Sequence, residues 1–251
     1  VAGNIELQDF ALSGATITMT GRGLAFEIPE NLLTEVNADL VFGLSQAVPS
    51  LTGRVTILRG SYREPLSLAG QLLGGTTVVT AVADATEPSF ADRIQLGIAI
   101  ASDQDIVVDN NYGRLDLGSN LRVIGTLGEP VLAGRLTVQE GGEIFLGGRN
   151  YLVRRGTVDF TNATQIEPDM NLVLETRVQR YDVTLDVIGT PQTLQASLRS
   201  PGVSQEDVIS LLLTGQVAGR STTAQTEIAR GQLLMLLSGE LLSFAGRAVG
   251  V

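Results

Sequence analysis

The sequence predicts an all-β protein built on an elongated, antiparallel sheet, and three observations support this fold class. Apolar and polar residues alternate along most of the chain, as they do in half-buried strands. Gly, Pro and Asn separate the alternating runs at intervals of roughly 8–12 residues, which leaves no room for the helical crossovers of a parallel sheet. The third observation is an internal repeat of a strand-like segment.

Strict alternation marks the individual strands. Residues 181–187 and 193–199 switch between apolar and polar side chains without a break, which is typical of a strand with one face toward a core. Shorter stretches of the same kind predict further strands. They lie within residues 94–100, 115–123, 132–138, 143–146 and 157–160.

The internal repeat relates residues 51–60 to residues 132–141. The two segments share Leu, Gly, Arg, Thr and a final Gly at the same offsets. Their separation is too long for one coil of a minimal solenoid and suits a module of several strands. Repeated β modules predict an elongated molecule in which each unit stacks on its neighbours, and chance similarity between Gly-rich hairpins is the alternative.

The predicted organisation has four parts. Residues 1–62 form an upstream β module, residues 63–92 a loop or linker, residues 93–203 the main β module, and residues 204–251 a helical segment. The second part is irregular and contains a Gly-rich stretch, so its order is left open.

Two helices are expected in the C-terminal segment. Ser204 begins the first as an N-cap, because an acidic residue follows three positions later and an apolar run comes after it, up to Gly215. Apolar residues at 3–4 spacing from Leu234 to Ala248 predict the second. This second helix caps the end of the sheet in one interpretation and lies on a membrane surface in the other.

The composition excludes several chemistries. The chain has 251 residues and no His, Cys, Trp or Lys, so all seventeen basic residues are Arg. Without these side chains there is no imidazole base, thiolate nucleophile, zinc cluster or Schiff base. A net charge of −10 argues against nucleic acid as a partner. No run of about 18 apolar residues occurs, so no transmembrane segment is expected.

Polar candidate sites are weak. A solvated outer face explains the carboxylate pairs more simply than a catalytic cleft does, and the spacing of the first pair lacks the features of a calcium-binding loop. We therefore expect no enzyme activity, no metal and no cofactor. The pairs are Asp103 with Asp105, Asp182 with Asp186, and Glu167 with Asp169.

Four arginines have two possible roles. They could contact phospholipid headgroups at the rim of a groove, or they could pair with carboxylates across strands and keep the protein soluble. They are Arg135, Arg149, Arg154 and Arg155.

The apolar face of the predicted sheet has to be hidden from water. Two helices cannot cover so many strands, so the sheet curls into a sandwich, a barrel or a folded trough. Aromatic residues make up only 4 % of the chain, and the inward set is aliphatic. Such a wall suits acyl chains and suits a closed core equally well. The candidate groove residues are Leu136, Val138, Ile144, Leu146, Val158, Phe160, Leu172, Leu174, Val183, Leu185, Val187, Leu194, Ala196 and Leu198.

Several motifs together resemble the TamB C-terminal domain family. Residues 134–160 are similar to the glycine-punctuated strand signature of that family. The later pieces follow in the family's order. They are Glu167–Leu172, Tyr181–Gly189, Leu198–Pro201 and Ser204–Gly215. The resemblance is strong from Ile94 to Gly215 and weaker over Val36–Tyr62.

This resemblance implies a folded sheet called a β-taco, which is an open trough with an apolar interior. It also implies a periplasmic location in a diderm bacterium and an inner-membrane anchor in the full-length protein. The implied partners are phospholipid acyl chains and an outer-membrane protein of the BamA type, similar to TamA. The implied functions are phospholipid transport to the outer membrane and the assembly of autotransporters.

Two function classes follow. In the first, the trough shields acyl chains, because exposing a 16-carbon chain to water costs roughly 13 kcal/mol at about 0.8 kcal/mol per methylene. In the second, an exposed sheet edge or the trough holds a nascent outer-membrane strand by β-augmentation.

Overall fold

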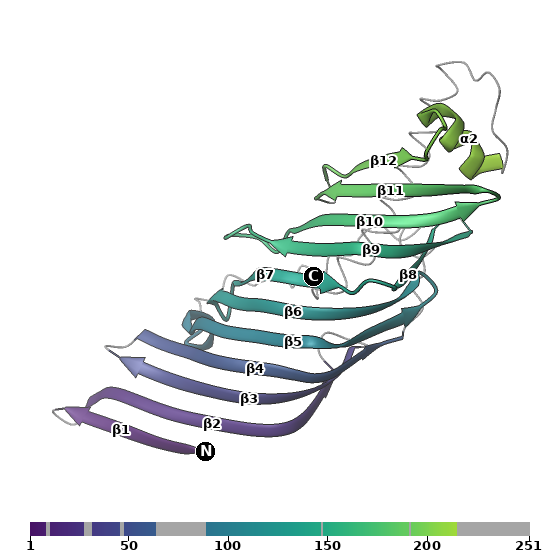
Figure 1. Ribbon diagram of the computed structural model, residues 1–251. Coiled ribbons are helices and arrows are strands. Elements are labelled where there is room, and N and C mark those ends of the chain that lie inside the picture. Colours follow the sequence, from purple (N-terminus) through teal and green to yellow (C-terminus); the bar gives the residue numbers. More distant parts are fainter. Residues whose placement is uncertain are drawn as a thin grey trace, which may run out of the picture.

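The computed structural model describes residues 1–8, 11–27, 32–45, 48–63, 89–146, 148–190 and 192–214. Nearly all of them belong to one sheet of twelve strands, which confirms the all-β prediction. The sheet is long and bent, and its strands run across its long axis (Figure 1). With strands spaced about 4.8 Å apart, the path from the first strand to the last is roughly 50 Å long.

The strands follow one another along the chain with few interruptions. The first of the two predicted C-terminal helices, the one that begins after Ser204, is also present, as α2 (Gln205–Thr214). The second predicted helix, Leu234 to Ala248, lies outside the described residues. The strands are β1 (Ala2–Gln8), β2 (Ala11–Glu27), β3 (Leu32–Ser45), β4 (Val48–Tyr62), β5 (Gln95–Asn110), β6 (Gly113–Thr126), β7 (Pro130–Val138), β8 (Glu143–Leu146), β9 (Arg149–Phe160), β10 (Pro168–Val178), β11 (Tyr181–Gly189) and β12 (Gln195–Arg199), and a short 3-10 helix, η1 (Ala91–Arg93), precedes β5.

The order of strands in the sheet is almost the order of the chain. It runs β1-β2-β3-β4-β5-β6-β7-β9-β10-β11-β12, and the short β8 pairs with β6 and β9 beside this path. The sheet continues without a break from the predicted upstream module into the predicted main module, through β4 and β5. The four-part division of the chain stays a prediction.

One strand pair is parallel, which differs from the purely antiparallel sheet that the spacing of turns predicts. β4 and β5 run in the same direction, with Leu51 beside Leu96 and Tyr62 beside Val108. A parallel neighbour needs a long connection that returns to the starting edge. The connection from β4 to β5 runs from residue 63 to residue 94 and is long enough for this return. Most of it, residues 64–88, lies outside the described residues.

The internal repeat corresponds to equivalent positions in the sheet. Gly53 on β4 and Gly134 on β7 both have positive φ angles, 141° and 115°. A Cβ at Gly53 would overlap the Asp39 carbonyl oxygen of the preceding strand, and a Cβ at Gly134 would overlap that of Asn120. Both repeats therefore need glycine for the same reason, which is the close approach of a neighbouring backbone.

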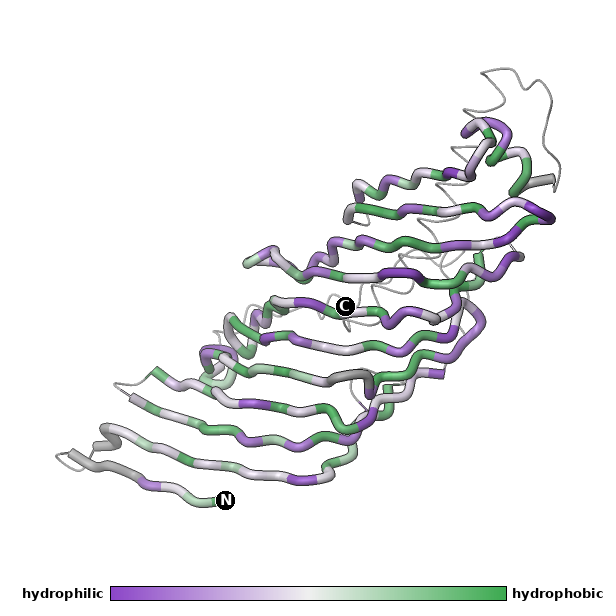
Figure 2. Tube along the Cα trace, in the orientation of Figure 1, coloured by the Kyte–Doolittle hydropathy of each residue, from purple (hydrophilic) through white to green (hydrophobic). Residues whose placement is uncertain are grey.

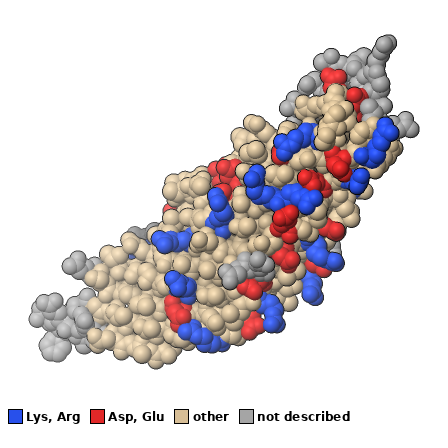
Figure 3. Space-filling model, in the orientation of Figure 1, with Lys and Arg blue, Asp and Glu red and all other residues tan. Residues whose placement is uncertain are grey.

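The two faces of the sheet differ in polarity. Polar and apolar residues alternate along the strands (Figure 2), and basic and acidic side chains are interspersed on the outer face (Figure 3). Cross-strand ion pairs join these charges, for example Arg22 with Asp39 at 2.8 Å and Arg154 with Glu175 at 2.7 Å. The hydrogen bond from Arg22 lowers the pKa of Asp39.

The core lies on the inner face, from β5 to α2. Leu174, Val183 and Val187 are fully buried there, together with Val208 and Leu211 of the helix. The Ser204 hydroxyl caps α2 by accepting a hydrogen bond from the backbone N–H of Asp207 at 3.2 Å, as its sequence predicts. At the other end of α2, the Nε of Arg149 donates to the carbonyl oxygen of Leu212 at 3.0 Å.

Candidate functional site

The inner face of the sheet carries a continuous line of small and aliphatic residues across nine strands. The pairing register fixes this line, because directly paired residues project from the same face. We call it the deep row. It consists of Thr34, Gly60, Ile106, Leu117, Val138, Gly156, Leu172, Val187 and Ala196.

A second line lies nearer the other ends of the strands and is more accessible. We call it the shallow row. Its side chains are half-buried, in contrast to the core around the deep row. It consists of Met19, Leu40, Gly53, Ile98, Val123 and Leu132. On β2–β7 the inner face is therefore accessible at the shallow row, whereas the core around the deep row is packed from β5 to α2.

The predicted groove residues lie on this inner face, on β7 to β12 and the turn before β12. Ten are buried and four are half-buried, namely Leu136, Val158, Leu194 and Ala196. Leu185, for example, is only 1 % exposed and lies between Leu174 and Leu198 in the register. The structure thus shows a packed core at most of these positions, and their contact with lipid stays a prediction.

Sequence reasoning missed the accessible part of the inner face. Leu40, Leu51 and Ile98 are half-buried residues on β3–β5, with their side chains on the apolar side. The alternation in residues 94–100 was the available signal. Alternation identifies a strand and its apolar face. It does not show on which strands that face stays accessible to solvent, because accessibility depends on how the sheet bends.

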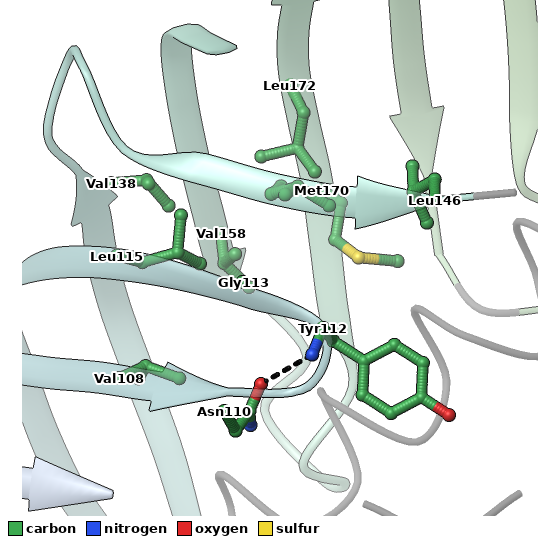
Figure 4. A pocket seen from close by; sticks show the side chains of 11 residues that line it. Val108, Asn110, Tyr112, Gly113, Leu115, Val138, Leu146, Val158, Met170 and Leu172 are labelled. Atoms are coloured by element: carbon green, nitrogen blue, oxygen red, sulfur yellow. Dashed lines mark hydrogen bonds between the residues drawn. The ribbon is translucent and has the colours of Figure 1, made fainter. Parts of the chain in front are cut away.

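A cavity of about 40 Å³ lies on the inner face near the turn between β5 and β6 (Figure 4). Five predicted groove residues contribute to its wall, and six further residues come mainly from the end of β5 and the start of β6. The cavity is lined by Val108, Asn110, Tyr112, Gly113, Leu115, Val138, Ile144, Leu146, Val158, Met170 and Leu172.

The interior of this region is apolar enough to change the ionisation of a neighbouring phenol. Tyr151 on β9 is 4 % exposed and belongs to the core. Burial raises the pKa of Tyr151, and the positive charge of Arg149 opposes this rise. A phenol that resists ionisation is expected where water is excluded.

The candidate arginines do not form a single headgroup site. Arg135 pairs with Asp159 on the neighbouring strand, and Arg154 pairs with Glu175 and with Glu140. Arg155 is exposed, and Arg149 binds the C-terminal carbonyl end of α2. Cross-strand pairing, the second of the two predicted roles, therefore describes Arg135 and Arg154.

The candidate carboxylates lie apart from the cavity. Asp182 pairs with Arg177 at 3.4 Å and Asp186 with Arg199 at 3.2 Å, so both belong to the charged outer face. Glu167 accepts a hydrogen bond from Asn162, and Asp169 is exposed. The Asp103 side chain lies outside the described residues, while Asp105 is exposed.

Two features are absent from the described part of the chain. No three Asp or Glu side chains gather in a group that could hold a metal ion. No helix in the same part of the chain is both long and apolar enough to cross a membrane.

The chain was compared with known protein families and with curated proteins. The family model of the TamB C-terminal domain matches residues 1–250, which is almost the whole chain. No curated protein matches significantly.

Proposed function

The chain belongs to the TamB C-terminal domain family, and from this premise we propose that it shields phospholipid acyl chains along its inner face during transport between the two membranes. The family functions in outer-membrane assembly and lipid transport in the envelope of diderm bacteria. The proposal adds the ligand, the location in the periplasm and the surface that carries the lipid.

The observation that carries the proposal is the accessible apolar surface of the shallow row. Leu40, Ile98 and Val123 have half-buried side chains, Gly53 on β4 lies between Leu40 and Ile98, and the row contains no charged residue. The outer face of the same strands carries Asp39 and Arg54 in direct register. The shallow row is aliphatic, and the opposite face of the same strands is charged. Contact with such a row removes methylenes of an acyl chain from water, where each one costs about 0.8 kcal/mol. The row offers no polar group that would hold the acyl chain in one place.

The packed core limits where a lipid can lie on the inner face. The core around the deep row is packed from β5 onward, and α2 covers the last strands with Val208 and Leu211 in the core. A lipid on the shallow row would therefore lie over β2–β7, beside the packed core and not within it. In the proposed pathway a BamA-type partner, similar to TamA, receives the lipid at the outer membrane.

The test compares two aspartates at consecutive positions of β4. Leu51→Asp places a charge on the inner face, beside Phe42 and Leu96, whereas Thr52→Asp places the same charge on the exposed outer face. The purified chain is incubated with phospholipid and examined by native mass spectrometry, and circular dichroism checks that both variants are folded. We expect bound phospholipid in the wild type and in Thr52→Asp, and at least a fivefold loss in Leu51→Asp.

The half-buried position Leu51 is chosen because a charge at a core position would unfold the protein, and loss of folding could not be distinguished from loss of lipid binding. A charge at Leu185, which is 1 % exposed, would bury an unpaired carboxylate and unfold the sheet. A wild-type chain free of lipid, or equal binding by the two folded variants, would contradict the proposal.

Assembly of outer-membrane proteins is the second candidate function. The observation in its favour is the edge of β12, a strand of five residues that pairs only with β11 among the described strands. A client strand could pair with such an edge. This function predicts that Leu51→Asp, on the distant β4, leaves client binding unchanged, whereas lipid shielding predicts a loss of lipid.

A further inference from the structure

Helix α2 is the part of the described core that does not belong to the sheet. Its side chains Val208 and Leu211 are fully buried, and Ile209 and Leu212 are nearly so. The other buried residues of the same core cluster all lie on strands between β5 and β12. The helix lies beside β12, at the end of the sheet (Figure 1). Four aliphatic side chains of one short helix therefore close the inner face at this end.

A short turn joins α2 to the sheet. β12 ends at Arg199, and an isolated bridge between Ser200 and Val203 encloses Pro201 and Gly202. Gly202 is exposed and has a φ of 72°, and a Cβ added there would meet nothing within 4 Å. Because Gly202 lies outside the packed core, its backbone angles can change while β12 stays in the sheet.

The cavity near the β5–β6 turn reaches the hairpin that holds the other end of α2. Leu146 lines this cavity and is the register partner of Arg149, whose Nε donates to the Leu212 carbonyl oxygen at 3.0 Å. The cavity of about 40 Å³ is larger than the roughly 10–15 Å³ that one water molecule needs, and its wall is mostly aliphatic. An alkyl group can therefore enter the core beside the contact that holds α2.

The helix and an acyl chain offer this core the same kind of surface. Contacts between aliphatic groups have no fixed direction, and their free energy follows the apolar area removed from water. The deep row, which ends at Ala196 on β12, contains no charged residue. An acyl chain that follows this row toward α2 therefore leaves no buried charge without a partner.

We propose that α2 is a displaceable plug. In the lipid-free protein its aliphatic side chains fill the end of the inner face, and the acyl chain of a phospholipid takes their place when it arrives from the accessible strands. The inference rests on the proposed function and deepens it, because it names the element that opens the packed end of the inner face to lipid.

The first experiment changes the lipid and follows the helix. The purified chain is loaded with dipalmitoyl phosphatidylcholine, or with dihexanoyl phosphatidylcholine, which has the same headgroup and much shorter acyl chains. Native mass spectrometry measures how much lipid is bound, and hydrogen exchange is recorded for the amides from Val208 to Leu212. We expect the long-chain lipid to accelerate this exchange about fivefold and the short-chain lipid to leave it unchanged.

This measurement distinguishes a plug from a helix with a purely structural role. A helix that only completes the core keeps its exchange rate, or exchanges more slowly, when a ligand binds the folded protein, because such a ligand stabilises the folded state. Acceleration by bound lipid is expected only where the lipid replaces the helix.

The second experiment loosens the helix and measures lipid affinity. Arg149→Met removes the donor to the Leu212 carbonyl, whereas Arg177→Met removes an exposed arginine that pairs with Asp182. Because the helix competes with the acyl chain, the loss of one hydrogen bond favours the lipid. We expect the dissociation constant of dipalmitoyl phosphatidylcholine to fall about fivefold in Arg149→Met and to stay unchanged in Arg177→Met. Circular dichroism checks that both variants are folded.

The results that would overturn the inference differ in what else they remove. Unchanged or slower exchange in α2 with the long-chain lipid bound, or equal dissociation constants for the two variants, would eliminate the plug and leave acyl-chain shielding in place. Equal acceleration by the short-chain lipid would attribute the effect to the headgroup and would also eliminate the plug. Absence of bound lipid would eliminate the proposed function together with the plug.

Discussion

At the residue scale, glycine decides how closely neighbouring strands approach. Gly53 and Gly134 occupy the same position in the internal repeat, and at each one a side chain would meet the backbone of the preceding strand. The sequence shows the repeat, but it does not show that the shared glycine is needed for contact between strands. That requirement appears only with the pairing register.

Gly134→Ala is therefore expected to destabilise the sheet. The substitution combines an unfavourable φ of 115° with overlap onto the Asn120 carbonyl oxygen, and we expect the free energy of unfolding to fall by about 1–3 kcal/mol. Urea denaturation followed by circular dichroism measures it.

Gly43→Ala is the control for this substitution. Gly43 also lies within a strand, but its φ is not positive, and its added Cβ would contact only the side-chain oxygen of Ser50, at 3.2 Å. Its effect should stay below about 1 kcal/mol. Equal losses for the two variants would contradict the proposed role of Gly134.

At the scale of the element, α2 closes the packed end of the sheet and is held at both termini. Ser204 caps its beginning, and Arg149, which begins β9, binds the Leu212 carbonyl at its end. The N-terminal cap follows directly from the sequence, because serine and an acidic residue three positions later form a local signal. The contact from Arg149 spans 63 residues, and no local pattern predicts it.

We expect Arg149→Met to loosen α2 without unfolding the sheet. The substitution keeps much of the apolar stem and removes the donor to the Leu212 carbonyl, which is worth about 1 kcal/mol. Hydrogen exchange of the amides from Val208 to Leu212 should accelerate about fivefold.

Arg177→Met is the matched variant for this experiment. Arg177 is exposed and pairs with Asp182 across a hairpin, away from α2. Its removal should leave exchange in the helix unchanged. If both variants accelerated exchange in α2 equally, Arg149 would have no specific role in closing the end of the sheet.

At the scale of the whole molecule, alternation in the sequence translates into a sheet with an apolar inner face and a charged outer face. The fold class was predictable because the period of two recurs in almost every strand. The division of the inner face into accessible and packed parts was not, because it depends on the bend of the sheet and on the position of α2. The predicted groove residues consequently fall mainly in the packed part, on β7 to β12.

The cavity shows the same limit for the site. Val138 and Leu172 were predictable as inward residues, since they alternate with polar neighbours on their strands. Asn110 was not, because a polar residue before a turn usually faces solvent. Only the pairing of β5 with β6, and the hydrogen bond to Tyr112, reveal that its nitrogen is buried.

The central claim, that lipid contacts the inner face and not the outer face, is tested most directly by photo-crosslinking in cells. A photoreactive amino acid is placed in the full-length protein at Leu40 and Ile98 on the inner face, and at their neighbours Asp39 and Ala99 on the outer face. Crosslinked phospholipid is then detected by mass spectrometry. The account predicts lipid at both inner positions and none above background at the outer positions. Equal labelling of the two faces, or lipid at neither, would contradict it.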